Sequence, residues 1–250
     1  MEFTTETLAI LFLAAACAGL MDTLAGGGGL ITIPALIMSG VPPLAALGTN
    51  KLQGCLGTAT SSYLLFTRKK IHWRELRAPM LFAFIGAAAG AVAIQYINTA
   101  MLRFIIPCTL VLIAVYFLLS PYLKLNTEKP RLSAAAYQKF VMPSIGAYDG
   151  AFGPGTGSFF ALAGVSLRGL ELIKATAAAK PLNFATNLAS LIIFIFADQV
   201  LWLPGAVMII GQMLGAWLGS HFLFKINPAF LRLLIVSICC LMLVRYYVVG

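Results

Sequence analysis

Long apolar segments alternate along the chain with short polar connections. The apolar segments are continuous rather than alternating in polarity, which favours membrane helices over the strands of a barrel. Most of them approach the roughly 20 residues that a helix needs to cross the hydrocarbon core of a bilayer. We expect helical elements at residues 7–24, 30–39, 43–66, 78–97, 100–120, 138–151, 158–167, 171–197, 201–223 and 229–249.

Two of these elements, 30–39 and 158–167, have about half the length required to cross a bilayer. Each follows a glycine-rich stretch, where a continuous helix would break. Irregular backbone at membrane depth is tolerated where it is buried in protein or lines a wet cavity. The pattern predicts an all-α, polytopic membrane protein with two sets of five elements. Whether the short element of each set is re-entrant or a full span is left open.

Composition supports the same class. The chain is 60% hydrophobic and 10% charged, whereas soluble domains carry about 25% charged residues. The N-terminal stretch MEFTTETLAIL is acidic and lacks the basic region of a signal peptide, so we expect the first helix to stay in the mature protein. His72 and His221 lack a second metal-type residue at ligand spacing, and no GxxxxGK[ST] loop occurs. We therefore expect no metal and no cofactor.

The net charge of +9 indicates topology rather than nucleic-acid binding. Most basic residues lie on connections that alternate to one side of the predicted bundle, and by the positive-inside rule that side is cytoplasmic. Both termini are then outside. The basic residues of these connections are Arg68, Lys69, Lys70, Arg74, Arg77, Lys124, Lys129, Arg131, Lys139, Arg168, Lys174, Lys225 and Arg232.

An internal repeat relates the two halves of the chain. Four pairs of segments match in the same order: 19–29 with 146–156, 50–61 with 179–190, 85–92 with 210–217, and 98–106 with 227–235. The matches pair Asp22 with Asp149, Gly26 with Gly153, Gly28 with Gly155, Lys51 with Lys180, and Arg103 with Arg232. The charge pattern puts Arg103 outside and Arg232 inside, so the halves are predicted to be inverted repeats, an architecture common among secondary transporters. The predicted division is repeat 1 at 1–120, a cytoplasmic connection at 121–137, and repeat 2 at 138–250.

The glycine breaks are candidates for binding an anion. Glycines 26–29 and the stretch GPGTGS at 153–158 leave N–H groups exposed and admit close approach to the backbone. The first short helix is expected to begin near Thr32, with Pro34 in its first turn. Two opposed helix N-termini would then present N–H groups and positive dipole ends to one anion. Close packing alone is the alternative. The residues assigned here to the substrate are Gly26, Gly27, Gly28, Gly29, Gly153, Gly155 and Thr156.

Lysines at membrane depth form the second part of the candidate site. A charged side chain there costs about 2.5–3.5 kcal/mol on insertion scales, so it normally has a partner or a function. We expect Lys51 and Lys180 to contact an anionic substrate. Internal ion pairs with Asp22 and Asp149 are the alternative, and proton coupling through either aspartate is left open. The predicted hydrogen-bonding residues beside the lysines are Asn50, Gln53, Asn183 and Asn187.

Small-residue motifs predict close helix packing. GAAAG at 86–90 and GQMLGAWLG at 211–219 carry the GxxxG spacing that lets membrane helices approach each other. These motifs are assigned to packing rather than to chemistry.

The glycine and lysine motifs resemble those of the TauE/SafE family, also called sulfite exporters or TSUP permeases. The resemblance rests on D-x-x-x-GGGG-x-x-x-x-P followed by TNKLQ, on YDG-x-FGPG-x-GS, and on KATAxAK-x-LN-x-xTN. It implies an inner-membrane permease for small sulfur-containing anions and covers nearly the whole chain. Pro181, directly after Lys180, removes a backbone donor from that part of the second half.

We therefore predict a secondary transporter for a small anion, either sulfite or another sulfur oxyanion or organosulfonate. The site lies at the bilayer midplane between the repeats, and alternating access moves one repeat against the other. A passive anion channel is one alternative, and an intramembrane aspartyl protease using Asp22 and Asp149 is another. The expected partners are the anion and the lipid bilayer, without nucleic acid. A homodimer is left open.

Overall fold

The computed structural model describes residues 3–97, 130–223 and 225. The predicted elements 100–120 and 229–249 lie outside these residues, together with Arg103, Lys124, Lys129 and Arg232. The described elements are α1 (Thr5–Ala25), α2 (Gly29–Met38), α3 (Pro43–Thr67), α4 (Trp73–Ile94), α6 (Ala134–Ala136), a π-helical turn η2 (Tyr137–Val141), α7 (Met142–Ala151), α8 (Thr156–Arg168), α9 (Leu172–Phe196) and α10 (Trp202–Phe222).

The prediction of an all-α membrane protein is confirmed. No strand occurs in the described part of the chain, and α1, α4, α9 and α10 are each long and apolar enough to cross a membrane. Helix α3 is as long as α9 but holds many polar residues in its middle. The polar middle of α3 lies inside the protein, because Asn50, Lys51 and Gln53 are all buried.

Three predicted helix starts were wrong, and one is that of the element predicted at 138–151, which is already helical at Ala134 within the predicted connection. Helix α2 begins at Gly29 rather than near Thr32, because Gly28 is already in the right-handed helical region at φ −55° and ψ −42°. Pro34 consequently lies in the interior of α2 instead of its first turn. Helix α4 begins at Trp73, five positions earlier than the predicted 78. The first turn of α4 is polar and charged like a connecting segment, so the hydrophobic pattern did not reveal that its backbone is helical.

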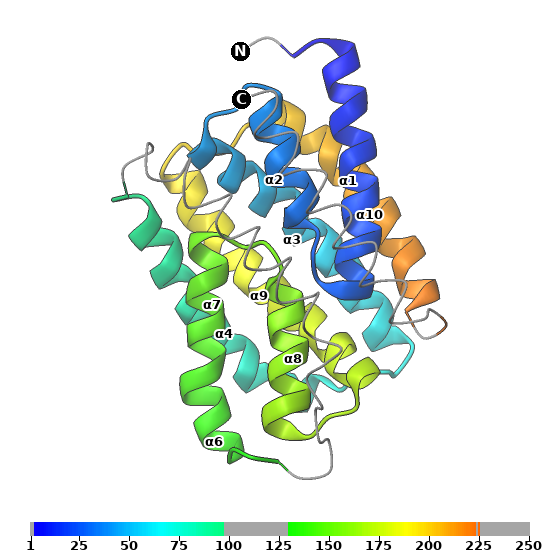
Figure 1. Ribbon diagram of the computed structural model, residues 1–250, viewed down its shortest axis with the longest axis vertical. Helices are drawn as coiled ribbons and strands as arrows, with labels where there is room; N and C mark the ends of the chain where they lie inside the picture. The colour runs from blue at the N-terminus through cyan, green and yellow to red at the C-terminus, as the bar shows by residue number, and fades with distance from the viewer. Residues whose placement is uncertain (1–2, 98–129, 224, 226–250) are drawn as a thin grey trace.

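Helices of each half of the chain pack on helices of the other half. Helix α1 packs on α10, and α4 packs on α7. Helices α3 and α9 contact each other at the centre, while α3 also packs on α10 and α9 on α4. In Figure 1, α1 starts at the top of the view and α6, which leads into α7, lies at the bottom. Two related halves packed about a pseudo-twofold axis would give these pairings. The inverted repeat and its boundaries stay predictions.

Glycines bring the outer helix pairs into close contact, as the small-residue motifs predict. A Cβ atom on Gly90 of α4 would lie 2.0 Å from the carbonyl oxygen of Ala147 on α7. A Cβ atom on Gly215 of α10 would lie 2.0 Å from the carbonyl oxygen of Ala16 on α1. Only glycine allows backbones this close, so the packing role of both motifs is confirmed.

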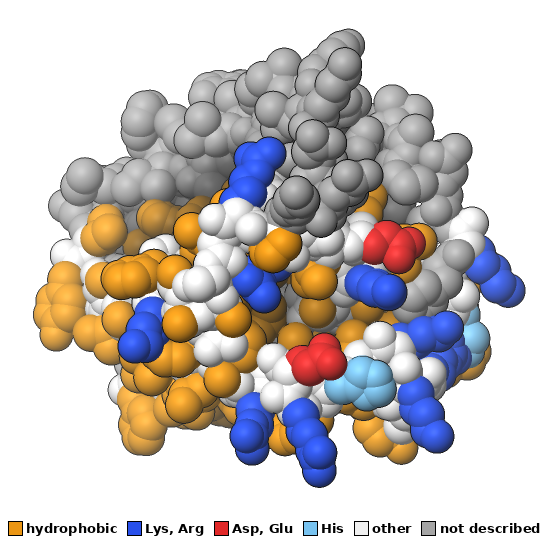
Figure 2. Space-filling view, turned by 90° about the horizontal axis from the view of Figure 1, so that it is seen from below, with side chains coloured by type: hydrophobic (Ala, Val, Ile, Leu, Met, Phe, Trp, Pro, Cys, Tyr) orange, Lys and Arg blue, Asp and Glu red, His pale blue; other side chains and the backbone are white. Residues whose placement is uncertain are grey.

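The basic connections meet at one end of the molecule. Arg68, between α3 and α4, donates to the carbonyl oxygen of Ser220 at 3.1 Å, near the end of α10. Arg168, at the end of α8, donates to the carbonyl oxygen of Leu132 at 2.6 Å in the central connection. Figure 2 shows Lys and Arg side chains gathered on this end. The clustering that the charge pattern predicts is therefore present, and the assignment of this end to the cytoplasm stays a prediction.

Candidate substrate site at the two glycine breaks

The two glycine breaks lie directly against each other. Gly26 ends α1 in the left-handed conformation at φ 79°, and a Cβ atom there would lie 2.3 Å from the backbone nitrogen of Ser158. A Cβ atom on Gly157 would lie 2.6 Å from the Cα atom of Gly26. The Ser158 hydroxyl also donates to the carbonyl oxygen of Ala25. The starts of α2 and α8, which are far apart in the sequence, are therefore neighbours in space.

The second break needs glycine for its conformation as well as for space. Gly153 has φ 94° and Gly155 has φ 76°, values that residues with a Cβ atom rarely adopt. A Cβ atom on Gly153 would lie 2.8 Å from the Lys51 ammonium nitrogen. The glycine at 153 therefore makes room for a lysine from the other half of the chain.

Each half-helix has an aspartate of the preceding helix at its N-terminus. The Asp22 carboxylate accepts from the Gly28 N–H at 3.3 Å, at the start of α2. The Asp149 carboxylate accepts from the Thr156 hydroxyl at 2.8 Å, at the start of α8. Negative charge is favoured at a helix N-terminus, where N–H groups lack intrahelical partners. The carboxylates of Asp22 and Asp149 thus lie at the two half-helix N-termini, where the sequence pattern predicts a bound substrate anion.

The buried lysines reach across from one half to the other. Lys51 of α3 forms an ion pair with the Asp149 carboxylate at 2.8 Å, and its ammonium group also donates to the Asp149 carbonyl oxygen. Lys180 of α9 donates to the carbonyl oxygen of Asp22. Both lysines are almost fully buried, with exposed fractions of 1% and 0%. The internal ion pair that the sequence left as an alternative is therefore formed by Lys51, while Lys180 bonds the main chain of its aspartate.

Amide side chains surround the same region. Asn50 accepts from the Thr32 hydroxyl at 2.5 Å and from the Gln53 amide at 2.8 Å, which ties α3 to α2. On α9, Asn187 donates to Asn183 at 3.2 Å. All four predicted amide residues are buried, so these polar groups lie inside the protein and not toward lipid.

A small polar cavity lies where these elements meet. Its volume is about 20 Å³, which is room for about one water molecule. It is lined by Asp22, Gly28, Gly29, Asn50, Gln53, Gly54, Asp149, Gly153, Asn183, Asn187 and Gln212. The remaining predicted site residues do not line this cavity but adjoin it through the contacts above or through the chain: Gly26, Gly27, Lys51, Gly155, Thr156 and Lys180.

The structure adds residues that sequence reasoning missed. Gln212 of α10 lines the cavity, and Thr32, Gly157 and Ser158 make contacts that hold the breaks together. A glutamine in an otherwise apolar helix is a recognisable signal of an interior position. The other three carry no comparable signal, since Thr, Ser and Gly are frequent in helix–helix contacts of membrane proteins.

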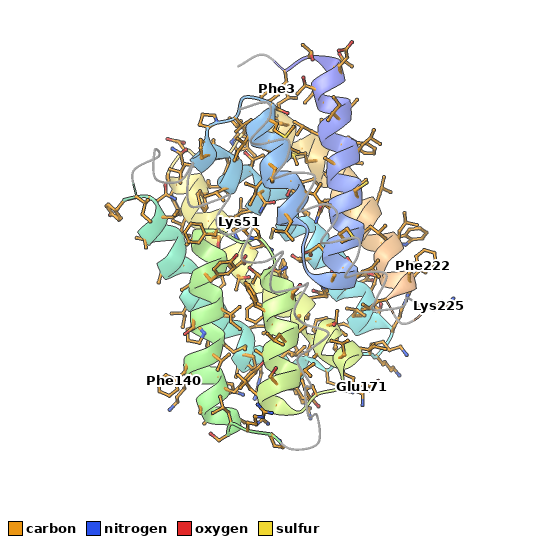
Figure 3. All side chains as sticks on the ribbon, in the orientation of Figure 1. Phe3, Lys51, Phe140, Glu171, Phe222 and Lys225 are labelled. Atoms are coloured by element: carbon orange, nitrogen blue, oxygen red, sulfur yellow. The ribbon has the colours of Figure 1, made fainter. Side chains whose placement is uncertain are left out.

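The site lies near the middle of the molecule along its long axis. In Figure 3, Lys51 lies between Phe3 at the top of the view and Phe140 and Glu171 at the bottom. A position halfway between the two ends is where inverted-repeat transporters bind substrate.

The comparisons with known proteins point to membrane transport. A family model described as "Sulfite exporter TauE/SafE" matches residues 11–246. A "Probable membrane transporter protein" of Haemophilus influenzae is 43% identical over 243 residues, which cover 97% of this chain and 95% of that protein. The "Probable membrane transporter protein YfcA" of Escherichia coli (strain K12) is 40% identical over 235 residues, covering 94% and 87%. The "Probable membrane transporter protein ORF9" of Sinorhizobium sp is 40% identical over 244 residues, covering 98% and 94%. No solved structure gives a significant match.

Proposed function

Because this chain belongs to the sulfite exporter TauE/SafE family of membrane transporters, we propose that it is a secondary permease for a small sulfur-containing anion. Sulfite, another sulfur oxyanion or a short organosulfonate is the substrate class. The family and its relatives are transporters by name, so the chain is not an enzyme and the aspartyl protease alternative falls away. The observation that carries the proposal is the contact between the two glycine breaks, where two helix N-termini and two buried lysines converge.

The charges around the breaks suit an anion that competes with the two aspartates. The Asp149 carboxylate is held by Lys51 and by the Thr156 hydroxyl at the start of α8. The Asp22 carboxylate is held by the Gly28 N–H at the start of α2, and Lys180 bonds the Asp22 main-chain carbonyl oxygen. A substrate anion offers these same donors what a carboxylate offers, namely negative oxygen acceptors. We therefore assign Lys51, Lys180 and the glycine N–H groups to substrate binding, and Asp22 and Asp149 to coupling, with a proton gradient as the first driving force to test.

Alternating access would be a movement of one half against the other. The contacts of Lys51 with Asp149 and of Lys180 with Asp22 both connect helices of different halves. They are therefore the contacts that such a movement would break and remake. A cavity with room for one water is too small for a sulfur oxyanion, so the site must widen before substrate enters. A closed site that opens on movement favours a carrier over a passive channel.

Orientation follows from the charge distribution. We place the basic end of the molecule in the cytoplasm and both termini outside, within the inner membrane. The short helices α2 and α8 are placed as re-entrant elements, because their N-termini meet inside the protein.

Flux measurements in proteoliposomes test the proposal. The purified protein is reconstituted and offered radiolabelled or spectroscopically detected sulfite, thiosulfate and short sulfonates, with and without a proton gradient. We expect saturable uptake of at least one of these anions, with counterflow. Uptake without saturation or counterflow would indicate a channel, and transport of cations alone would show that the substrate class is wrong.

Lysine variants test the site itself. Lys51→Ala and Lys180→Ala are each expected to reduce transport at least about tenfold, because a hydrogen bond to a charged group contributes about 1.5–3 kcal/mol. Lys139→Ala is the matched control, since Lys139 is exposed on the basic end of the molecule. Parental rates for both buried-lysine variants would refute the assignment of the lysines to the substrate.

A further inference from the structure

Three oxygen atoms around the central cavity have no hydrogen-bond partner among the described residues. They are Oε1 of Gln53, Oδ2 of Asp149 and Oε1 of Gln212, each on a residue that is 1% exposed. All three residues line the cavity of about 20 Å³. Buried polar atoms nearly always have a partner, so three unpartnered acceptors at one cavity form a site suited to a ligand that supplies positive charge or donors.

The orientation of the Gln53 amide follows from its neighbours. Its nitrogen donates to Asn50 Oδ1 at 2.8 Å, an oxygen that also accepts from the Thr32 hydroxyl. Reversing Gln53 alone would bring its oxygen against the Asn50 oxygen. The Gln53 oxygen is therefore the amide atom without a partner, and Asp149 contributes a carboxylate oxygen that has no alternative orientation as a donor.

The formal charges around the cavity are balanced before any ligand enters. Asp22 and Asp149 line it, and the charged groups that face them are Lys180 and Lys51. Two carboxylates and two ammonium groups leave no net charge. An entering anion would therefore add an uncompensated buried negative charge, which is strongly unfavourable at this depth.

We propose that the cavity binds one monovalent cation of sodium size, and that the substrate anion binds beside this cation once the site has widened. The inference rests on the proposed function and names the coupling ion of the same site. Hard cations bind oxygen ligands, and the unpartnered oxygens come from α3, α7 and α10. A proton on one carboxylate would supply a single donor, whereas the cavity that all three residues line has room for one ion the size of a water molecule. One positive charge balances a monovalent anion such as bisulfite or a sulfonate, whereas a divalent cation beside the same anion would leave an uncompensated positive charge.

Cation and anion binding at this site are then mutually favourable. Each ligand offsets the charge that the other introduces, and the coupling must be reciprocal. Sodium ions should tighten anion binding by the same factor by which the anion tightens sodium binding. A sodium gradient could in this way drive the movement of the anion.

The first test uses the purified full-length protein in two series, one with a fixed concentration of a short sulfonate and one without it, and the sodium effect should be larger with the anion. Thermal unfolding is followed by tryptophan fluorescence in NaCl, KCl and choline chloride at equal ionic strength. We expect Na⁺ to raise the unfolding temperature in a saturable way by several degrees, because a ligand that binds only the folded state stabilises it by mass action. Equal unfolding temperatures in the three salts would overturn the proposal, as would stability that responds to pH but not to Na⁺.

Variants of Gln212 identify the cavity as the binding site. Gln212→Met removes one oxygen at nearly constant size and should weaken the sodium effect at least about tenfold. Gln212→Glu keeps an oxygen ligand and should retain the effect. Gln95→Met is the matched control, because Gln95 lies at the end of α4 and bonds the Ala91 carbonyl oxygen away from the cavity. An unchanged sodium effect in Gln212→Met would refute this location.

The two proposals fail in distinguishable ways. Sodium-specific stabilisation in a protein that moves no anion in liposomes would support the cation site and overturn the proposed function. Anion transport without any sodium-specific effect on stability or flux would support the function and overturn the cation site.

Discussion

Neutralising Lys51 alone should destabilise the protein more than neutralising Lys51 and Asp149 together. The two side chains form an ion pair at 2.8 Å and are 1% and 2% exposed. Lys51→Met leaves the Asp149 carboxylate buried with only the Thr156 hydroxyl bonded to its Oδ1 atom. Asp149→Asn keeps the side-chain Oδ1 atom and the main-chain carbonyl oxygen that accept from the Lys51 ammonium group, but it removes the negative charge. The double variant Lys51→Met/Asp149→Asn has no unpaired charge in this place.

The magnitude follows from burial. Removing one partner of a buried ion pair costs about 3–5 kcal/mol, whereas replacing both partners is often close to neutral. For a chain of 250 residues, each kcal/mol shifts the unfolding temperature by about 2–4 °C. Lys51→Met should therefore lower the unfolding temperature by roughly 6–20 °C. Asp149→Asn should cost less, at about 2–3 kcal/mol, because the ammonium group keeps its hydrogen-bond acceptors.

Thermal unfolding in detergent, followed by tryptophan fluorescence, provides the four measurements of a double-mutant cycle. The double variant should be at least about 2 kcal/mol more stable than the sum of the single effects predicts. Lys139→Met serves as the control, since an exposed lysine should change stability by less than about 0.5 kcal/mol. Additive losses within about 0.5 kcal/mol would show that the two charges do not depend on each other.

Three further predictions concern packing and topology. Gly26→Ala should lower the free energy of unfolding by about 1–3 kcal/mol more than Gly40→Ala. Both glycines have positive φ, but a Cβ atom would be crowded only at Gly26 and would have nothing within 4 Å at Gly40. Equal losses in thermal unfolding would contradict the close contact of the breaks. Gly150→Leu should separate α7 from α4 and abolish the monodisperse peak in size-exclusion chromatography, whereas the exposed variant Ser144→Leu should retain it. Glu6→Cys should react with an impermeant maleimide on intact cells and Ser133→Cys only after permeabilisation, and the reverse pattern would invert the proposed orientation.

The amino-acid sequence by itself determined the class of the protein and the places where its helices break. Hydrophobic runs, glycine clusters and basic connections act over short distances, so the pattern alone predicts the helical membrane fold and the clustered basic end. The small-residue motifs at Gly90 and Gly215 likewise predicted close packing, because only the absence of a side chain allows it. The sequence also identified Asp22, Lys51, Asp149 and Lys180 as candidate functional residues, because charges at membrane depth are costly.

Only the tertiary structure decided how these groups are connected. Lys51 pairs with the aspartate of the opposite half, both aspartates lie at half-helix N-termini, and Gln212 completes the cavity. The ion pair joins residues 98 positions apart, and the two aspartate contacts, over six and seven positions, form only because the chain reverses at each break. Their energies depend on distance and burial, which a one-dimensional pattern does not contain. The sequence therefore specified which polar groups must be buried, and the packing of the two halves decided which of them meet.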